Sequence, residues 1–213
     1  MRAILKGAAP ESFEKWKGMA NPDWAPNFSV LPNPEKRDLH ASLLSEQGFT
    51  CCYCGRSVDL DESHIEHFRP QHRFPALELD YNNMFASCQR ARPAGTPIIC
   101  GHHKGEAFDE ENFLSPLLDG VDMRFSYALD GRVQARPADI PAQTMIAALA
   151  LNSGFLVARR RMALAAVFDP QFIASATRGE LGELSASFRR RDTDGKLTSF
   201  YHAIARFAED LPQ

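Results

Sequence analysis

The positions of the five cysteines limit what this chain can fold into more than any other feature of its sequence. Three cysteines fall within four positions, in TCCYCGRSVDL, and two follow much later at Cys88 and Cys100. Cys51 and Cys54 form a C-x-x-C turn followed by Gly55, and two thiolates on such a turn can bind one tetrahedral ion. Because half a site is insufficient, two more soft ligands are needed. We therefore predict a structural Zn²⁺ bound by Cys51, Cys54, Cys88 and Cys100.

A disulfide framework explains the same cysteines less well. Five is an odd number, and the first residues, MRAILKGAAPESFEKWK, contain no apolar segment typical of a signal peptide. No apolar run reaches the ~18–20 residues that a membrane span needs. We therefore expect a cytoplasmic protein without a membrane segment, in a reducing compartment where clustered cysteines more often bind metal. His102 is an alternative ligand to Cys100, and Cys52 is expected to face the core as a small apolar side chain.

The rest of the sequence predicts an α+β protein. Apolar residues recur at helical spacing before the cysteines, and turn-forming residues surround them. Asp130-Gly131 separates two alternating runs typical of a hairpin, and the apolar spacing from Pro141 onward fits amphipathic helices. The predicted parts are an N-terminal segment 1–48 with helices at 10–20 and 34–47, a zinc-containing part 49–118 with a hairpin, short strands and one short helix, and a part 119–213 with a β-hairpin and a helical region.

Charge gives no global sign of a nucleic-acid partner. The net charge is −3 at pH 7, from 24 Lys+Arg against 27 Asp+Glu. Nucleic acid would therefore have to be bound by local basic patches instead of an overall basic field. Two arginine runs, at 159–161 and 189–191, are candidates, and a solvated helix face explains each of them equally well.

Short blocks around the later cysteines carry a second pattern. HIEHFRP has an acidic residue directly before a histidine, LDYNNMFASC has an asparagine five residues before the third zinc cysteine, and CGHHKG places His and Lys after the fourth. In these features the chain resembles the HNH endonucleases. Together with CCYCGR, NFLSPLLDG, FSYALDGRV and LALNSGFLVARR, the blocks are similar in kind and order to the HNH subunit of Septu-type and retron-associated anti-phage systems. The resemblance covers roughly residues 35–165.

The resemblance implies a fold and a function. The fold is an HNH ββα-metal finger, in which a hairpin and a helix surround one catalytic cation and a four-cysteine zinc lies behind them. The function is hydrolysis of nucleic-acid phosphodiester bonds, in DNA or RNA, with Mg²⁺ or Mn²⁺ as the catalytic cation. The expected setting is an anti-phage complex with an ABC/SMC-like ATPase. The alternative is a catalytically inactive, zinc-stabilised module that binds nucleic acid or a partner.

The same resemblance assigns catalytic roles. His67 would be the general base that deprotonates the attacking water. Glu66, where the family usually has Asp, would be a ligand of the catalytic cation. Asn83 would hydrogen-bond the base and hold its ring. His103 would complete the catalytic metal site, with His102 as the competing choice.

Further residues around the expected site have less certain roles. Strand alternation places His64 on the same face as Glu66 and opposite the base, so His64 is a rival of Glu66 for the cation. Lys104 is expected to contact a phosphate. Arg69 and Arg73 are further candidates for contacts with nucleic acid, and Arg73 is also explained as ordinary surface.

Overall fold

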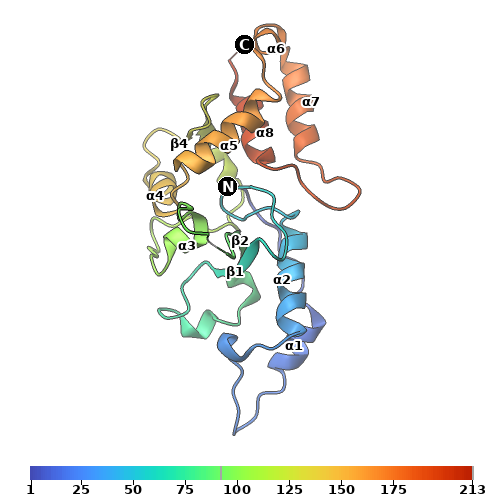
Figure 1. Ribbon diagram of the computed structural model, residues 1–213, viewed down its shortest axis with the longest axis vertical. Helices are drawn as coiled ribbons and strands as arrows, with labels where there is room; N and C mark the ends of the chain where they lie inside the picture. Colours follow the sequence, from blue (N-terminus) through green and yellow to red (C-terminus); the bar gives the residue numbers. More distant parts are fainter. Residues whose placement is uncertain (92, 213) are drawn as a thin grey trace.

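A computed structural model describes residues 1–91 and 93–212 (Figure 1), and its N-terminal part forms the two predicted helices. α1 spans Glu11–Lys17 and α2 spans Glu35–Glu46. Phe13 and Trp16 are the buried positions of α1, and α2 buries Leu39, Leu43 and Leu44 at helical spacing. Both helices pack against each other, and α2 also contacts the central sheet.

The central part is built on a two-stranded antiparallel sheet. β1 spans Ser63–His67 and β2 spans Met84–Cys88, with Ser63 opposite Cys88 and His67 opposite Met84. The strands pair as predicted, but the connection 68–83 is a long segment with two 3-10 turns, η2 (Pro75–Leu77) and η3 (Tyr81–Asn83), instead of a tight hairpin loop. The short helix α3, Cys100–Lys104, contacts β2.

A second small sheet follows at the predicted hairpin. After the 3-10 turn η4 (Val121–Arg124), β3 spans Phe125–Tyr127 and pairs antiparallel with β4, Val133–Ala135. Gly131 in the connecting turn has φ +89°, and a Cβ there would lie 2.2 Å from the carbonyl oxygen of Val157. Glycine is therefore required both by the backbone conformation and by the close approach of α5.

The C-terminal part is helical, as predicted, and it includes a short helix between two longer ones. α4 (Ile140–Ala148), α5 (Gly154–Ala165), α6 (Pro170–Ser175), α7 (Arg178–Phe188) and α8 (Tyr201–Asp210) follow in order. The short helix is α6, which begins with a proline and is capped by Asp169, whose Oδ1 accepts the N–H groups of Gln171 and Phe172. Within the described residues no helix combines the length and the apolar character needed to cross a bilayer.

Two hydrophobic clusters stabilise the fold. The larger one joins both N-terminal helices, both sheets and α4. The smaller one lies among the last four helices and is formed by Leu164, Phe168, Leu181, Ile204, Phe207 and Ala208. Figure 1 shows the resulting arrangement, with α1 and α2 at one end, α6–α8 at the other, and β1, β2 and α3 between them.

Three arginines of the two runs bind to other segments of the chain. Arg160 is buried and donates to the carbonyl oxygens of Gly131 at 2.6 Å and Leu151 at 2.8 Å, so neither a solvated face nor a nucleic-acid patch describes it. Arg189 forms ion pairs with two carboxylates. Arg191 donates to two carbonyl groups at the end of α2. Only the buried Arg160 contradicts both expectations, whereas Arg189 is half-buried and Arg191 is exposed.

Candidate functional site

Four of the five cysteines converge beside β2 and α3. The Sγ atoms of Cys51, Cys54, Cys88 and Cys100 all lie within 4.8 Å of one another, and all four side chains are buried. The Cys54 and Cys88 sulfurs are 4.0 Å apart, close to the ~3.8 Å that tetrahedral Zn–S bonds of ~2.3 Å require. None of the cysteines forms a disulfide. The predicted four-cysteine set is therefore confirmed as a group that can bind a structural metal ion such as zinc.

The surroundings of the cluster suit bound thiolates. The backbone N–H of Cys88 donates to the Cys51 sulfur at 3.4 Å, and the Ser87 hydroxyl lies 3.8 Å from the same sulfur. Burial raises the pKa of the Cys100 thiol, so a cation is needed to keep this group as a thiolate. Cys52 is buried in the core outside the cluster, as expected, and burial raises its pKa as well.

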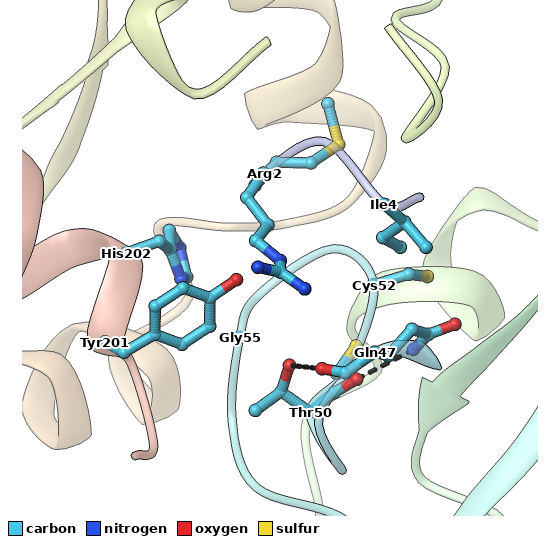
Figure 2. A pocket seen from close by; sticks show the side chains of 10 residues that line it. Arg2, Ile4, Gln47, Thr50, Cys52, Gly55, Tyr201 and His202 are labelled. Atoms are coloured by element: carbon cyan, nitrogen blue, oxygen red, sulfur yellow. Dashed lines mark hydrogen bonds between the residues drawn. The ribbon is translucent and has the colours of Figure 1, made fainter. Parts of the chain in front are cut away.

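The loop that carries Cys51 and Cys54 is held by α2 and α8 (Figure 2). Gln47 donates its side-chain amide to the carbonyl oxygen of Thr50 at 2.7 Å, and the Thr50 hydroxyl donates back to the Gln47 carbonyl at 2.8 Å. Gly55 has φ +73°, and a Cβ there would lie 2.0 Å from the His202 ring. The guanidinium of Arg2 lies over the ring of Tyr201 on α8. The cavity that remains among these side chains has a volume of about 10 Å³ and can hold one water at most.

Glu66 lies at the centre of a buried charge network near the end of β1. Its Oε1 accepts a hydrogen bond from the Tyr53 hydroxyl and an ion pair from Lys104, each at 3.1 Å. Its Oε2 is 3.5 Å from Nε2 of His64. Burial raises the pKa of the Glu66 carboxyl, but His64 and Lys104 outweigh burial and hold the pKa below its ordinary value. Glu66 is therefore an ionised carboxylate in a largely dry environment.

His67, the last residue of β1, is fixed as a neutral ring. Its Nε2 is 2.9 Å from the carbonyl oxygen of Glu78, so Nε2 carries the proton and donates it. The Gln71 side-chain amide then donates to Nδ1 at 2.8 Å. The ring of Phe28 packs edge-on at 4.6 Å, and burial lowers the pKa of His67. These contacts leave the lone pair of His67 on Nδ1.

Asn83 does not hold the His67 ring, so the predicted hydrogen bond between them is wrong. Its Oδ1 accepts the N–H of Arg69 at 2.7 Å, and its Nδ2 donates to the carbonyls of Arg69 at 2.9 Å and Leu77 at 3.1 Å. Asn83 thereby ties together the two ends of the segment between the strands. The groups that contact the ring are instead the Glu78 carbonyl and Gln71.

The histidines of α3 point in different directions. His102 contacts the His64 ring at a centroid distance of 4.3 Å, and its Nε2 is 2.6 Å from the carbonyl oxygen of Gln89. His103 is exposed, and its Nδ1 bonds the Ala148 carbonyl at 2.8 Å. The structure therefore does not bring His103 to Glu66. His102, the competing choice, is the histidine of α3 that lies at the site.

The residues predicted to contact nucleic acid are engaged within the chain. Arg69 pairs with Glu110 at 3.2 Å, and Arg73 donates to the Phe108 carbonyl at 2.7 Å. The Lys104 side chain is 1 % exposed and pairs with Glu66. The expectation that Lys104 contacts a phosphate is therefore corrected, because its charge is used inside the site.

An open cavity of about 610 Å³ gives access to this network. Its wall includes Glu66, His67, His64, His102 and Lys104, together with Gln71 and His72. His67 thus shares a cavity with Glu66, although strand alternation had placed it on the opposite face. This is possible because His67 is the last residue of β1, where the chain leaves the sheet.

The second cation expected from the sequence can be tested against these donors. Apart from the four cysteines, no three described His, Cys, Asp or Glu side chains are close enough to share an ion. The pair that does converge is Glu66 Oε2 and His64 Nε2. A Cβ on Gly101 would lie 2.3 Å from that oxygen and 3.0 Å from that nitrogen, so only glycine leaves this place open. Mg²⁺ and Mn²⁺ are often held by one or two protein ligands plus water and substrate phosphate, so the pair fits such an ion.

Three residues of the site were missed by the sequence analysis. Tyr53 lies between two zinc cysteines, and a tyrosine there can be buried with its hydroxyl turned to a polar partner. Gln71 follows the HIEHFRP block by one residue, which is a signal that could have been used. The Glu78 carbonyl is a backbone group, so the residue type does not indicate its role.

No protein-family model and no curated protein matches the chain.

Replacing Lys104 by methionine should strongly destabilise the protein, because it leaves the Glu66 carboxylate buried without its cation. We expect the free energy of unfolding, measured in urea, to fall by about 3–5 kcal/mol. The double variant Glu66→Gln/Lys104→Met should lose less than the sum of the two single variants. The control is Lys15→Met, which breaks an exposed pair with Glu11 and should cost ~0–1 kcal/mol. Strict additivity would contradict the pairing.

Proposed function

We propose that the chain is a metal-dependent endonuclease of the HNH type, which hydrolyses nucleic-acid phosphodiester bonds. One observation carries this proposal: His67, a neutral base with its lone pair on Nδ1, lines an open cavity together with an ionised carboxylate, Glu66. A module that only binds has no use for such a pair, whereas hydrolysis needs a base to activate water. The resemblance of the surrounding blocks to HNH nucleases supports the same reaction.

The residues of this chain perform the proton transfer as follows. The attacking water occupies the cavity beside His67, and the Gln71 amide moves its hydrogen bond from Nδ1 to that water. Nδ1 then removes a proton from the water as the water oxygen attacks the phosphorus. The bond from phosphorus to the leaving oxygen breaks, and that oxygen takes a proton from solvent. The Nε2–H donated to the Glu78 carbonyl stabilises the imidazolium that forms. The proton later passes to solvent.

Glu66 and His64 are the residues that would hold Mg²⁺ or Mn²⁺ in this proposal. When bound, such a cation stabilises the charge that develops on the phosphate and the leaving oxygen. Tyr53 and Lys104 hold Oε1 of Glu66, which leaves Oε2 directed to the shared place with His64. The four-cysteine ion has a structural role instead, because four protein ligands leave no open position for water.

The biological setting is a further part of the proposal. The order of the sequence blocks supports an effector in an anti-phage complex with an ABC/SMC-like ATPase. We assign the ATPase contact to the C-terminal helices, where Met162 on α5 is 70 % exposed. An exposed methionine suits a partner interface because its side chain adapts to different surfaces.

Strand cleavage by the purified chain tests the proposed reaction. Plasmid DNA and total tRNA are incubated with Mg²⁺ or Mn²⁺, with and without EDTA, and with and without the ATPase. Cleavage that stops in EDTA is the expected result, and the cleaved polymer names the substrate. Binding of nucleic acid without cleavage under all of these conditions would overturn the proposal in favour of the inactive zinc-stabilised module.

Replacing Gly101 by alanine should lower the cleavage rate about 100-fold while the zinc content is unchanged. The new Cβ would displace Glu66 and His64 by an ångström or so, and misplacement on that scale costs roughly 10²-fold. The matched control is Gly154→Ala at the start of α5, where a Cβ meets nothing within 4 Å. Equal rates for the two variants would contradict the place assigned to the cation.

A further inference from the structure

A second, larger cavity lies on the other side of β1. It has a volume of about 900 Å³ and shares His64 and Ile65 with the cavity that contains His67. Its other walls come from η1 (Phe28–Val30), from the first turn of α2, from the segment before β1 and from Arg90 after β2. We call this cavity the α2 groove. Because two of its lining residues belong to both cavities, a ligand in the α2 groove can continue to the hydrolytic site.

Three cations line the α2 groove, and two of them, Lys36 and Arg37, are more available than those predicted from the sequence. Lys36 and Arg37 project from the first turn of α2, and neither forms an ion pair with any residue that the structure describes. Arg90 donates to the Leu60 carbonyl and lies 3.8 Å from Asp61. The Asp61 side chain is 97 % exposed, and a pair so exposed is weak.

The two carboxylates of the groove, Asp59 and the largely solvated Asp61, offset two of the three cations, so the lining stays positive by one charge. Asp59 is turned to its own loop, where its Oδ1 accepts the N–H groups of Asp61 and Glu62, each at 2.8 Å. His40 is buried and hydrogen-bonds Ser63, and burial lowers its pKa to about 4, so it is neutral near pH 7. The groove is therefore an anion-binding surface next to the hydrolytic site.

Aromatic rings accompany the cations. Phe28 lines the groove with one side and packs against the ring of His67 at 4.6 Å, and the Lys36 ammonium lies 4.7 Å from the Phe28 ring centroid. Phe49 lines another part of the same groove. Cations for phosphates interleaved with rings for bases are how proteins bind single strands, whose bases are free to stack. Paired bases inside a duplex cannot reach such rings.

We propose that the α2 groove binds a single-stranded polynucleotide, DNA or RNA, beside the phosphate to be cleaved. The Lys36 ammonium and the Arg37 and Arg90 guanidinium groups contact backbone phosphates, and Phe28 stacks on a base next to His67. This inference rests on the proposed nuclease function and adds the strand type and its path.

Binding to labelled oligonucleotides tests the groove without relying on cleavage. The His67→Ala chain is titrated, with no divalent cation added, against a single-stranded DNA, an RNA of the same sequence and the corresponding DNA duplex. Fluorescence anisotropy gives the affinity at several salt concentrations. Tighter binding of either single strand than of the duplex is expected. The same titration with the unsubstituted chain, also without divalent cation, guards against an effect of the His67 substitution on folding.

The decisive comparison is between two double variants with the same change in charge. Lys36→Ala/Arg37→Ala should reduce the magnitude of the slope of log K against log [salt] by about 1.4, or ~0.7 for each lost phosphate contact. Lys15→Ala/Lys17→Ala on α1 should leave the slope unchanged. An unchanged slope in the groove variant, a duplex bound as well as the strands, or no binding at all would overturn the inference. Tight, groove-dependent binding by a chain that never cleaves would overturn the proposed reaction and leave the groove assignment standing.

Discussion

We expect the replacement of His67 by alanine to abolish strand cleavage and to leave the fold and any bound zinc in place. Removing a general base typically costs 10²–10⁴-fold in rate, which is the largest effect on activity that we expect from one side chain. The loss should be specific because Gln71, which hydrogen-bonds Nδ1, has no basic nitrogen, and the pKa of Glu66 is held low by His64 and Lys104.

The matched control is His72→Ala. His72 lines the same cavity as His67 but is exposed, so it reports any general effect of losing an imidazole there. Initial rates are measured with the polymer and cation that support cleavage by the unsubstituted chain. Alanine at 67 also leaves the Glu78 carbonyl without its donor, at a cost of ~1–3 kcal/mol, so urea unfolding is measured in parallel. Full activity in a folded His67→Ala chain would refute the role of this histidine.

Loss of one cluster cysteine should have the largest effect on stability. Cys54→Ala removes one of four zinc ligands, and structural zinc contributes an apparent ~10–16 kcal/mol in small zinc-binding peptides. Whole domains are stable by only ~5–15 kcal/mol, so this variant should lose its bound zinc and unfold at much lower temperature. An ion bound there would join the Cys51–Cys54 loop to β2 and α3; without it, packing and a few hydrogen bonds remain, such as that from the Cys52 N–H to the Ala86 carbonyl at 3.0 Å.

Cys52→Ala is a sharp control for this experiment. Cys52 lies in the same loop and is as deeply buried as Cys54, but its sulfur is outside the cluster. We expect one zinc per chain by elemental analysis and a nearly unchanged melting temperature. If both alanine variants kept one zinc and melted together, the four-cysteine assignment would be wrong. The same comparison after dialysis against a chelator should make the unsubstituted chain resemble Cys54→Ala.

The cysteine cluster was predictable because few side chains in the chain can serve as the third and fourth soft ligands of a metal ion. Two thiols on a tight turn need partners, and the chain offers few others, so the spacing of Cys88 and Cys100 mattered little. The Asp130-Gly131 hairpin was predictable for a similar reason, since a turn that needs a positive φ favours glycine. Both are cases in which one local requirement admits a single solution.

The details of the hydrolytic site were not predictable, because they depend on contacts between distant segments. His102 and His103 are adjacent on α3, but the first bonds the Gln89 carbonyl and the second the Ala148 carbonyl, and both partners come from other segments of the chain. Asn83 was assigned to the base by resemblance, but the long segment between the strands returns so that the Glu78 carbonyl reaches the ring first. The burial of Lys104 likewise follows from packing, and a lysine near a glycine-rich helix end does not indicate it.

The position of α8 determines how cooperatively the protein unfolds. Phe200 and Ala203, at its start, belong to the larger hydrophobic cluster, whereas Ile204, Phe207 and Ala208 belong to the smaller one. His202, in the first turn of α8, lies against the Cys51–Cys54 loop at Gly55. Both hydrophobic clusters lose buried contacts if α8 detaches. Heat or denaturant should therefore unfold the part with the cysteine cluster and the C-terminal helices in a single cooperative transition.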